Sequence, residues 1–200
     1  RNVSLSFNKD EKAVITGVNG SGKSTLARLA LGLLKPQRGR VLLDGKPVSK
    51  YSLAEVGAKI GYLGQYPARM LFTLNPYDEI AWGLRLRRMS PDEIHALCCE
   101  YLNLFGLWHI KDRNNFTLSE GQQQLVALSA VLALKPSMLL LDEPTKSIDA
   151  LRKRKLVGLL NRLSGQGAGL IVISHDRELA AALGGREIRM LKGEVVKDEP

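Results

Sequence analysis

The feature that most constrains this chain is the run at residues 17–24, which has the spacing G-x-x-x-x-G-K-[ST]. A short apolar stretch at residues 12–16 precedes it, and apolar residues at helical spacing follow over residues 23–34. Glycines let the backbone bend so that successive N–H groups face an anion, and the N-terminal end of the helix adds positive charge. The sequence therefore predicts a phosphate-binding loop between a strand and a helix.

Two side chains of this loop carry the expected chemistry. The ammonium group of Lys23 is placed to reach the β- and γ-phosphates of a nucleotide, and the hydroxyl of Ser24 is placed to bind Mg²⁺. The predicted nucleotide-binding residues are Gly17, Val18, Asn19, Gly20, Ser21, Gly22, Lys23, Ser24 and Thr25.

A second motif is the apolar segment at residues 139–144, which ends in two acids and a proline. If it is a strand next to the phosphate loop, Asp142 can hold Mg²⁺ through water and Glu143 can polarise a water for in-line attack on the γ-phosphate. A strand that ends in two acids is common by itself. Together with the phosphate loop, it indicates nucleotide hydrolysis.

The fold class follows from strands that alternate with helices, which predicts an α/β fold with a mainly parallel sheet. Residues 67–134 carry helical patterns without a convincing strand, so we interpret them as a helical insert. The predicted strands are residues 3–7, 12–16, 40–43, 60–63, 138–141 and 170–173, followed by a hairpin at 186–196. The predicted helices are residues 23–34, a helix opened by Ser90, residues 151–163 and a short helix after Asp176.

Size and charge set looser limits. Two hundred residues fit one domain or a domain with a small insert. The longest apolar runs have about four residues, whereas a membrane-spanning helix needs ~20. The net charge of +9 fits nucleic acid, an anionic membrane surface or a polyphosphate ligand as partner, or solubility alone. We interpret the basic residues at 85–88 and 152–155 as solvated faces of helices. The start at Arg1 instead of a methionine suggests a fragment of a longer polypeptide.

Further motifs resemble those of the ATP-binding-cassette (ABC) ATPases. Residues 118–122, Leu-Ser-Glu-Gly-Gln, resemble the signature peptide of that family. Gln65 resembles its Q-loop glutamine, residues 147–149 resemble its D-loop, and His175 resembles its switch histidine. The motifs stand in the family's order, and the resemblance covers nearly the whole chain.

The resemblance implies a P-loop NTPase (RecA-like) core with an antiparallel β edge over residues 1–66 and 135–200, and an α-helical subdomain over 67–134. Residues 1–200 are then one ABC ATPase domain, incomplete at its N-terminus. Such domains bind ATP with Mg²⁺ and work as dimers. Each ATP lies between one subunit's phosphate loop and the partner's signature, which here is Ser119, Glu120, Gly121 and Gln122.

The resemblance also assigns roles to single residues. Glu143, His175, Lys23 and Gln65 are the implied catalytic residues. Ser24, Gln65 and Asp142 are the implied Mg²⁺ ligands, and Asp149 is the D-loop aspartate. Independently of the family, Ser119 and Gln122 have the spacing of a capping box ahead of an apolar helix, and the exposed amides at that helix end can meet a phosphate that a partner presents.

The segment after Gln65 is similar to that of the energy-coupling-factor and cobalt-type importer ATPases. It reads Gln-Tyr-Pro, then Leu-Phe at residues 71–72 and Tyr-Asp-Glu-Ile-Ala-Trp-Gly at residues 77–83. This implies an ATPase at the cytoplasmic face of the cell membrane, bound peripherally, that powers uptake of a vitamin, a vitamin precursor or a metal ion. The surface near Gln65 and residues 71–82 is then expected to hold the transmembrane subunit.

Two other functions stay open. A nucleic-acid- or ribosome-associated ABC ATPase is compatible with the basic balance, but the basic residues are scattered and lack an aromatic stacking array, which makes nucleic acid the less favoured partner. The chain can also be a regulatory nucleotide-binding half with little turnover.

Two positions depart from the family pattern. Glu120 replaces the first glycine of the signature, and Leu125 stands where the family usually has arginine. A carboxylate ~6 Å from a phosphate charge costs about 3 kcal/mol at an effective dielectric of 20 if it faces the phosphate. We therefore expect a weaker composite site at this signature, and a heterodimer or tandem fusion rather than a homodimer. The adenine-stacking aromatic of the family lies upstream of Arg1.

Overall fold

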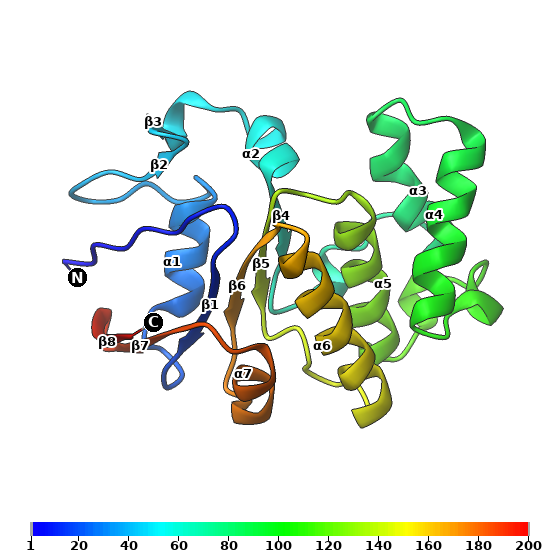
Figure 1. Cartoon of the computed structure of the whole chain (residues 1–200). Coiled ribbons are helices and arrows are strands. Elements are labelled where there is room, and N and C mark those ends of the chain that lie inside the picture. The colour runs from blue at the N-terminus through cyan, green and yellow to red at the C-terminus, as the bar shows by residue number, and fades with distance from the viewer. Residues whose placement is uncertain (1, 200) are drawn as a thin grey trace. The chain divides into compact units, whose positions relative to one another are not determined.

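The computed structural model describes residues 2–199, and these form two compact units (Figure 1). The first unit comprises residues 2–62, 136–143 and 161–199, and the second comprises residues 63–135 and 144–160. The second unit is larger than the predicted helical subdomain at 67–134, because it also contains residues 63–66, residue 135 and residues 144–160. None of the helices within residues 2–199 has the length and apolar character needed to cross a bilayer.

A six-stranded sheet in the order β4-β5-β6-β1-β7-β8 organises the first unit. Its strands are β1 Lys12–Thr16, β4 Ile60–Leu63, β5 Met138–Asp142, β6 Gly169–Ile173, β7 Arg186–Leu191 and β8 Glu194–Glu199. β1 pairs in parallel with β6 and β7, β5 pairs in parallel with β6, and β8 runs antiparallel to β7. This confirms the predicted α/β fold with a mainly parallel sheet and an antiparallel edge.

The central strands are buried on both faces, as parallel strands usually are. Three short helices belong to this unit: α1 Lys23–Ala30, α2 Leu53–Lys59 and α7 Arg177–Leu183. The helix α6, Ala150–Gly165, starts in the second unit and ends in the first. The hydrophobic core joins residues of the sheet to residues of α1 and α2, among them Ile15, Ala27, Val56 and Ile173.

The second unit is helical, as predicted for the insert. Besides most of α6 it contains α3 Pro76–Leu86, α4 Pro91–Leu104 and α5 Glu120–Ala133. The capping box expected from Ser90 is present with Glu93, whose side chain accepts from the Ser90 N–H. Tyr101 and Phe105 are among the largest fully buried side chains of this unit.

Three local expectations were wrong. Residues 3–7 alternate in burial but form no strand, because alternation gives a strand only where a neighbouring strand accepts its hydrogen bonds. The expected strand at 40–43 is reduced to β2 Leu42–Leu43, paired with β3 Lys46–Pro47. Helix α1 ends at Ala30 rather than at residue 34, since Gly32 takes a positive φ of 71°.

Candidate functional site

The predicted phosphate loop lies between β1 and α1, as expected. Gly17 has a φ of +146°, and a Cβ atom on it would lie 2.3 Å from the carbonyl oxygen of Met190. Gly22 stands at the N-cap of α1 with a φ of 102°, so no side chain of its own covers the first N–H groups of the helix. Backbone amides at an uncovered helix start are donors for an anion such as phosphate.

The side chain of Lys23 is folded over this loop. Its Nζ donates to the carbonyl oxygens of Gly17, at 2.7 Å, and Val18, at 3.1 Å. Burial lowers the pKa of Lys23, while the nearby carboxylates of Glu143 and Asp142 act to raise it. The loop therefore holds a cation between its own backbone and two acids.

Ser24 and Asp142, both predicted Mg²⁺ ligands, are in direct contact. The Ser24 hydroxyl donates to the Asp142 carboxylate over 2.7 Å, and Asp142 is 2% exposed. Burial raises the pKa of Asp142, and the hydrogen bond from Ser24 and the charge of Lys23 counteract that rise. A buried carboxylate beside a hydroxyl is a set of oxygen donors suited to Mg²⁺, which would offset the cost of the buried charge.

Glu143 follows β5 directly, and its carboxylate is held by the segment after β6. Its backbone has a positive φ of 53°, which is unusual for a residue other than glycine. One carboxylate oxygen accepts from the His175 N–H at 3.0 Å, and the other accepts from the Ser174 hydroxyl at 3.2 Å. The His175 Nε2 lies 3.6 Å from the first of these oxygens.

The sequence analysis missed Ser174. This residue is 1% exposed, and its hydroxyl also accepts from the Asp176 N–H at 3.0 Å. A serine between the end of a buried strand and His175 is the signal that could have found it. Ser174 thus orients the carboxylate that the sequence assigns to the attacking water.

The first unit therefore brings together the loop at residues 17–24, both acids and His175. Three adjacent strands do this, because β1, β6 and β5 are neighbours and each is followed directly by one of these segments. Gln65, the signature residues and Asp149 lie in the second unit. Their predicted roles toward the nucleotide stay predictions.

The signature residues form the start of α5. Ser119 is the N-cap and accepts from the Gln122 N–H at 3.3 Å, and the Ser119 N–H donates to the Gln122 side chain at 3.0 Å, so the predicted capping box is present. A Cβ atom on Gly121 would lie 2.2 Å from the carbonyl oxygen of Ser147. The carboxylate of Glu120 lies 3.3 Å from the ammonium group of Lys146.

Asp149 and the basic run after it have structural contacts within the second unit. Asp149 accepts from the backbone N–H of Arg152 at 2.9 Å and from its guanidinium at 2.6 Å, and these bonds lower the pKa of Asp149. Arg152 and Lys155 also donate to the carbonyl oxygens of Phe105 and Leu104, near the C-terminal end of α4. Lys155 is exposed, as the interpretation of a solvated face requires, whereas Arg152 is only partly exposed; both cations also stabilise the C-terminal end of α4, where positive charge is favoured.

Known proteins with similar sequences point to one family. Residues 1–146 match the family model described as "ABC transporter". A putative ABC transporter ATP-binding protein of Methanosarcina acetivorans is 37% identical over 99% of this chain, which spans 32% of that protein. The energy-coupling factor transporter ATP-binding protein EcfA2 of Methanospirillum hungatei is 34% identical over 98% of the chain and 50% of its own length. The chain spans about a third of the length of the first two relatives it matches.

Solved structures point the same way, and one of them contains the products of ATP hydrolysis. The dimeric, post-hydrolysis ATP-binding cassette MJ0796 bound to ADP and Pi aligns with a TM-score of 0.90 and 30% identity, over 100% of this chain and 89% of that one. CbiO1 of Clostridium perfringens, part of the ABC transporter complex cbiONQ, aligns with a TM-score of 0.81 and 31% identity, over 98% and 80%. With the phosphate loop and both acids in place, the chain belongs to the ABC transporter family, as one of its ATP-binding cassettes.

Proposed function

We propose that this cassette binds and hydrolyses Mg²⁺-ATP to drive a membrane transporter. One observation carries the proposal: Glu143, next to the contact between Asp142 and Ser24, is held by hydrogen bonds on both carboxylate oxygens. A general base fixed in this way keeps its orientation when a substrate water arrives.

Each residue of the site has a proposed role in ATP binding or hydrolysis that follows from its chemistry. The loop amides and Lys23 bind the phosphates of ATP, and Ser24 and Asp142 are placed to hold Mg²⁺, which neutralises phosphate charge when it is bound. Glu143 takes a proton from the attacking water while the new P–O bond forms and the bond to the leaving β-phosphate oxygen breaks. The imidazole of His175, 3.6 Å from Glu143, is the side chain we place next to the γ-phosphate.

Replacing Glu143 with glutamine tests hydrolysis against the regulatory alternative. Glu143→Gln keeps the shape but removes the base, so we expect steady ATP hydrolysis to stop while ATP binding persists. Glu100→Gln is the control, because Glu100 is an exposed residue on α4, in the second unit. Absence of hydrolysis in the unsubstituted chain with its partners, together with intact ATP binding, would instead support the regulatory half.

We infer that the partner is a second cassette, in a heterodimer or a tandem fusion rather than an identical copy. Glu120 adds an acid to the signature, and Leu125 replaces the usual arginine with a side chain that is 1% exposed. The dimeric form of a related cassette supports a paired state. Glu120→Gly should strengthen the composite site, and unchanged ATPase activity and ATP-driven pairing in that variant would contradict the idea.

The membrane partner is proposed to bind an apolar surface of the second unit, made of Phe72, Leu74, Trp82 and Leu86. These side chains are 64%, 70%, 46% and 71% exposed, and the rings of Phe72 and Trp82 meet edge to face with centroids 5.8 Å apart. Exposed apolar residues that lie together are typical of protein interfaces. A cytoplasmic segment of a transmembrane subunit, with apolar side chains of its own, fits this surface.

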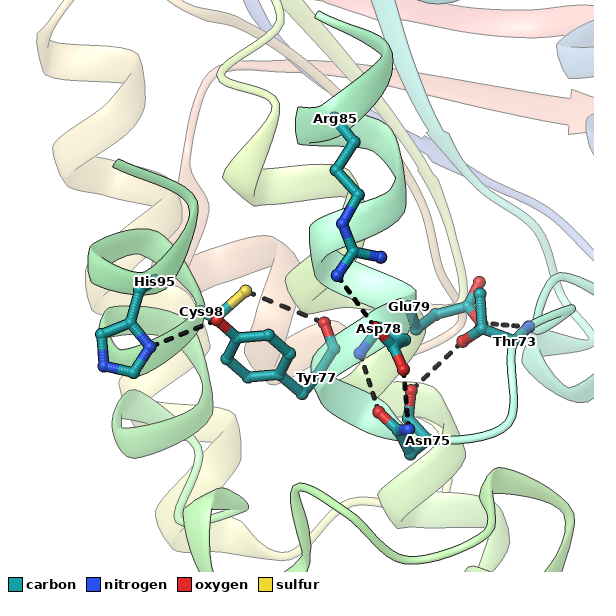
Figure 2. Close-up of polar contacts among 8 residues, drawn as sticks. All are labelled: Thr73, Asn75, Tyr77, Asp78, Glu79, Arg85, His95 and Cys98. Carbon is teal, nitrogen blue, oxygen red and sulfur yellow. Dashed lines mark hydrogen bonds and ion pairs between the residues drawn. The ribbon is translucent and has the colours of Figure 1, made fainter. Parts of the chain in front are cut away.

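A buried carboxylate fixes the loop that presents this surface. Glu79 is 4% exposed and accepts from the N–H groups of Phe72 and Thr73 and from the Thr73 hydroxyl, at 3.2, 2.9 and 2.7 Å. Figure 2 shows Glu79 next to Thr73 at the start of α3, with Asn75 and Asp78 forming the N-terminal cap beside them. The loop is thus held from inside, which leaves Phe72 and Leu74 exposed.

We propose an importer of the energy-coupling-factor or cobalt type, for a vitamin, a vitamin precursor or a metal ion, with the cassette bound peripherally at the cytoplasmic face of the membrane. The relative named as an energy-coupling factor transporter ATP-binding protein supports the transporter type, and the solved cassette of the cbiONQ complex supports a place in a transporter complex. Co-purification tests this against the nucleic-acid alternative. We expect membrane proteins to co-purify with the chain and to be lost in Phe72→Ser. Leu53→Ser, which changes an apolar side chain that is 63% exposed on α2 in the first unit, is the control. Partners released by nuclease would support the alternative.

A further inference from the structure

We infer that Lys146 neutralises Glu120 at the start of α5 and thereby sets how strongly this signature accepts the nucleotide of a partner cassette. The inference rests on the proposed function, in which the signature meets a phosphate in trans. It concerns a positioning residue outside the motifs that the sequence analysis singled out. Lys146 lies between Glu143 and the D-loop.

The contact between the two charges is direct. The Nζ atom of Lys146 lies 3.3 Å from Oε1 of Glu120, and the two side chains are 44% and 58% exposed. The same Nζ atom lies 5.7 Å from the centroid of the Tyr66 ring, a distance typical of a cation–π contact. Lys146 therefore contacts the signature and the residue after Gln65 at once.

The backbone keeps Lys146 in this place. Ser147 has a positive φ of 61°, and its carbonyl oxygen lies so close to Gly121 that a Cβ atom there would be 2.2 Å away. This close approach fixes the chain next to Lys146 against the first turn of α5. Since both backbones are constrained, little conformational entropy is lost when the side chains of Lys146 and Glu120 form their ion pair.

The effect on a phosphate depends on the sum of the two charges. Lys146 offsets the charge of Glu120, so the amides at the start of α5 meet an anion against less repulsion than Glu120 alone would give, although the site still lacks the free positive charge that Glu120→Gly would leave. Without Lys146, a full negative charge remains. Two like charges about 6 Å apart at an effective dielectric of 20 correspond to about 100-fold in an equilibrium constant, and salt reduces this value.

An exposed ion pair often contributes little to folding. Its energetic effect is expected here only when the partner's phosphates approach and exclude water. Folding stability alone therefore does not test the inference, whereas nucleotide-driven pairing does.

The test compares Lys146→Met, Lys146→Arg, Glu120→Gln and the double variant Glu120→Gln/Lys146→Met. Each is made in the Glu143→Gln chain, so that ATP is not consumed. Pairing is measured with Mg²⁺-ATP by analytical ultracentrifugation, against the cassette that co-purifies with this chain, or against a second copy where none does. Arg154→Met is the matched control, because it removes one exposed positive charge from α6 in the same unit.

We expect Lys146→Met to weaken pairing by about 10- to 100-fold at low salt, and by less at high salt. Lys146→Arg, the double variant and Arg154→Met should stay within about threefold of the parent chain, and Glu120→Gln, which leaves the positive charge of Lys146 without its carboxylate, should pair at least as tightly as the parent. The inference is overturned if Lys146→Met pairs like the parent, or if the double variant is as weak as Lys146→Met. If the parent binds Mg²⁺-ATP but never pairs in response to it, the proposed trans role itself fails.

Discussion

The close contact between Gly121 and Ser147 gives a prediction that requires only the isolated chain. In Gly121→Ala the new Cβ atom would lie 2.2 Å from the Ser147 carbonyl oxygen and 3.3 Å from its carbonyl carbon. Carbon and oxygen normally approach to about 3.3 Å, so the two backbones must separate by about 1 Å. No flexible side-chain end can absorb this shift, because both of these atoms belong to the backbone of Ser147.

We expect Gly121→Ala to lower the free energy of unfolding by about 1–3 kcal/mol, the usual cost of overpacking. Gly158→Ala is the matched control. Gly158 lies inside α6 with nothing within 4 Å of its added Cβ, so alanine there should raise stability by about 0.5–1 kcal/mol through helix propensity. The two variants carry the same chemical change with opposite expected signs.

Urea unfolding followed by tryptophan fluorescence measures the difference in the free energy of unfolding between the two variants, and it does so in the second unit. The chain has two tryptophans, Trp82 and Trp108, and both belong to the second unit, as do Gly121 and Gly158. Their signal therefore reports on the unit that the substitutions change. Equal urea midpoints for the two alanine variants would refute the packing argument.

Two further predictions concern the acids of the site. Ser174→Ala removes one of the two donors that hold the Glu143 carboxylate, so we expect kcat for ATP to fall by about 10-fold with little change in KM, and Ser174→Thr to restore it. A change in KM alone would contradict the positioning role. Burial raises the pKa of Asp142 above its ordinary 3.8, so the folded chain binds the proton of this carboxyl more tightly than the unfolded chain does. Ionisation of Asp142 therefore lowers the free energy of unfolding as pH rises from 3.8 through the folded pKa. Without nucleotide or metal, Asp142→Asn should therefore be more stable than the parent at pH 7, with a difference that shrinks as pH falls toward 4. The nearby charges of Lys23, Arg28 and His175 reduce the difference, and a gain that does not depend on pH would contradict this assignment.

Local sequence rules predicted the parts of the site that depend on neighbouring residues. The loop at residues 17–24, the helix caps at Ser90 and Ser119, and the two acids at the end of β5 each involve residues within a few positions of one another. Hydrogen bonds between residues close in sequence fix the conformation of each of these motifs, so the spacing of the residues is enough to predict them.

Contacts between distant segments could not be predicted in the same way. The Ser174 hydroxyl reaches Glu143 only because β6 and β5 are neighbours, and the pairing of Lys146 with Glu120 depends on the packing of Gly121 against Ser147. At residues 3–7 the sequence predicted a strand that does not form, because no neighbouring strand pairs with this alternating segment. In each case the deciding partner is remote in the sequence.

The division of the chain into two units has a mechanical consequence. The backbone leaves the first unit directly after Glu143, and it also leaves that unit three residues before Gln65. Two of its crossings are thus covalently tied to residues assigned to the hydrolysis step. A single peptide bond therefore joins the residue that we propose as the general base to the next stretch of the second unit, so one short piece of main chain serves both the catalytic side chain and the connection between the units.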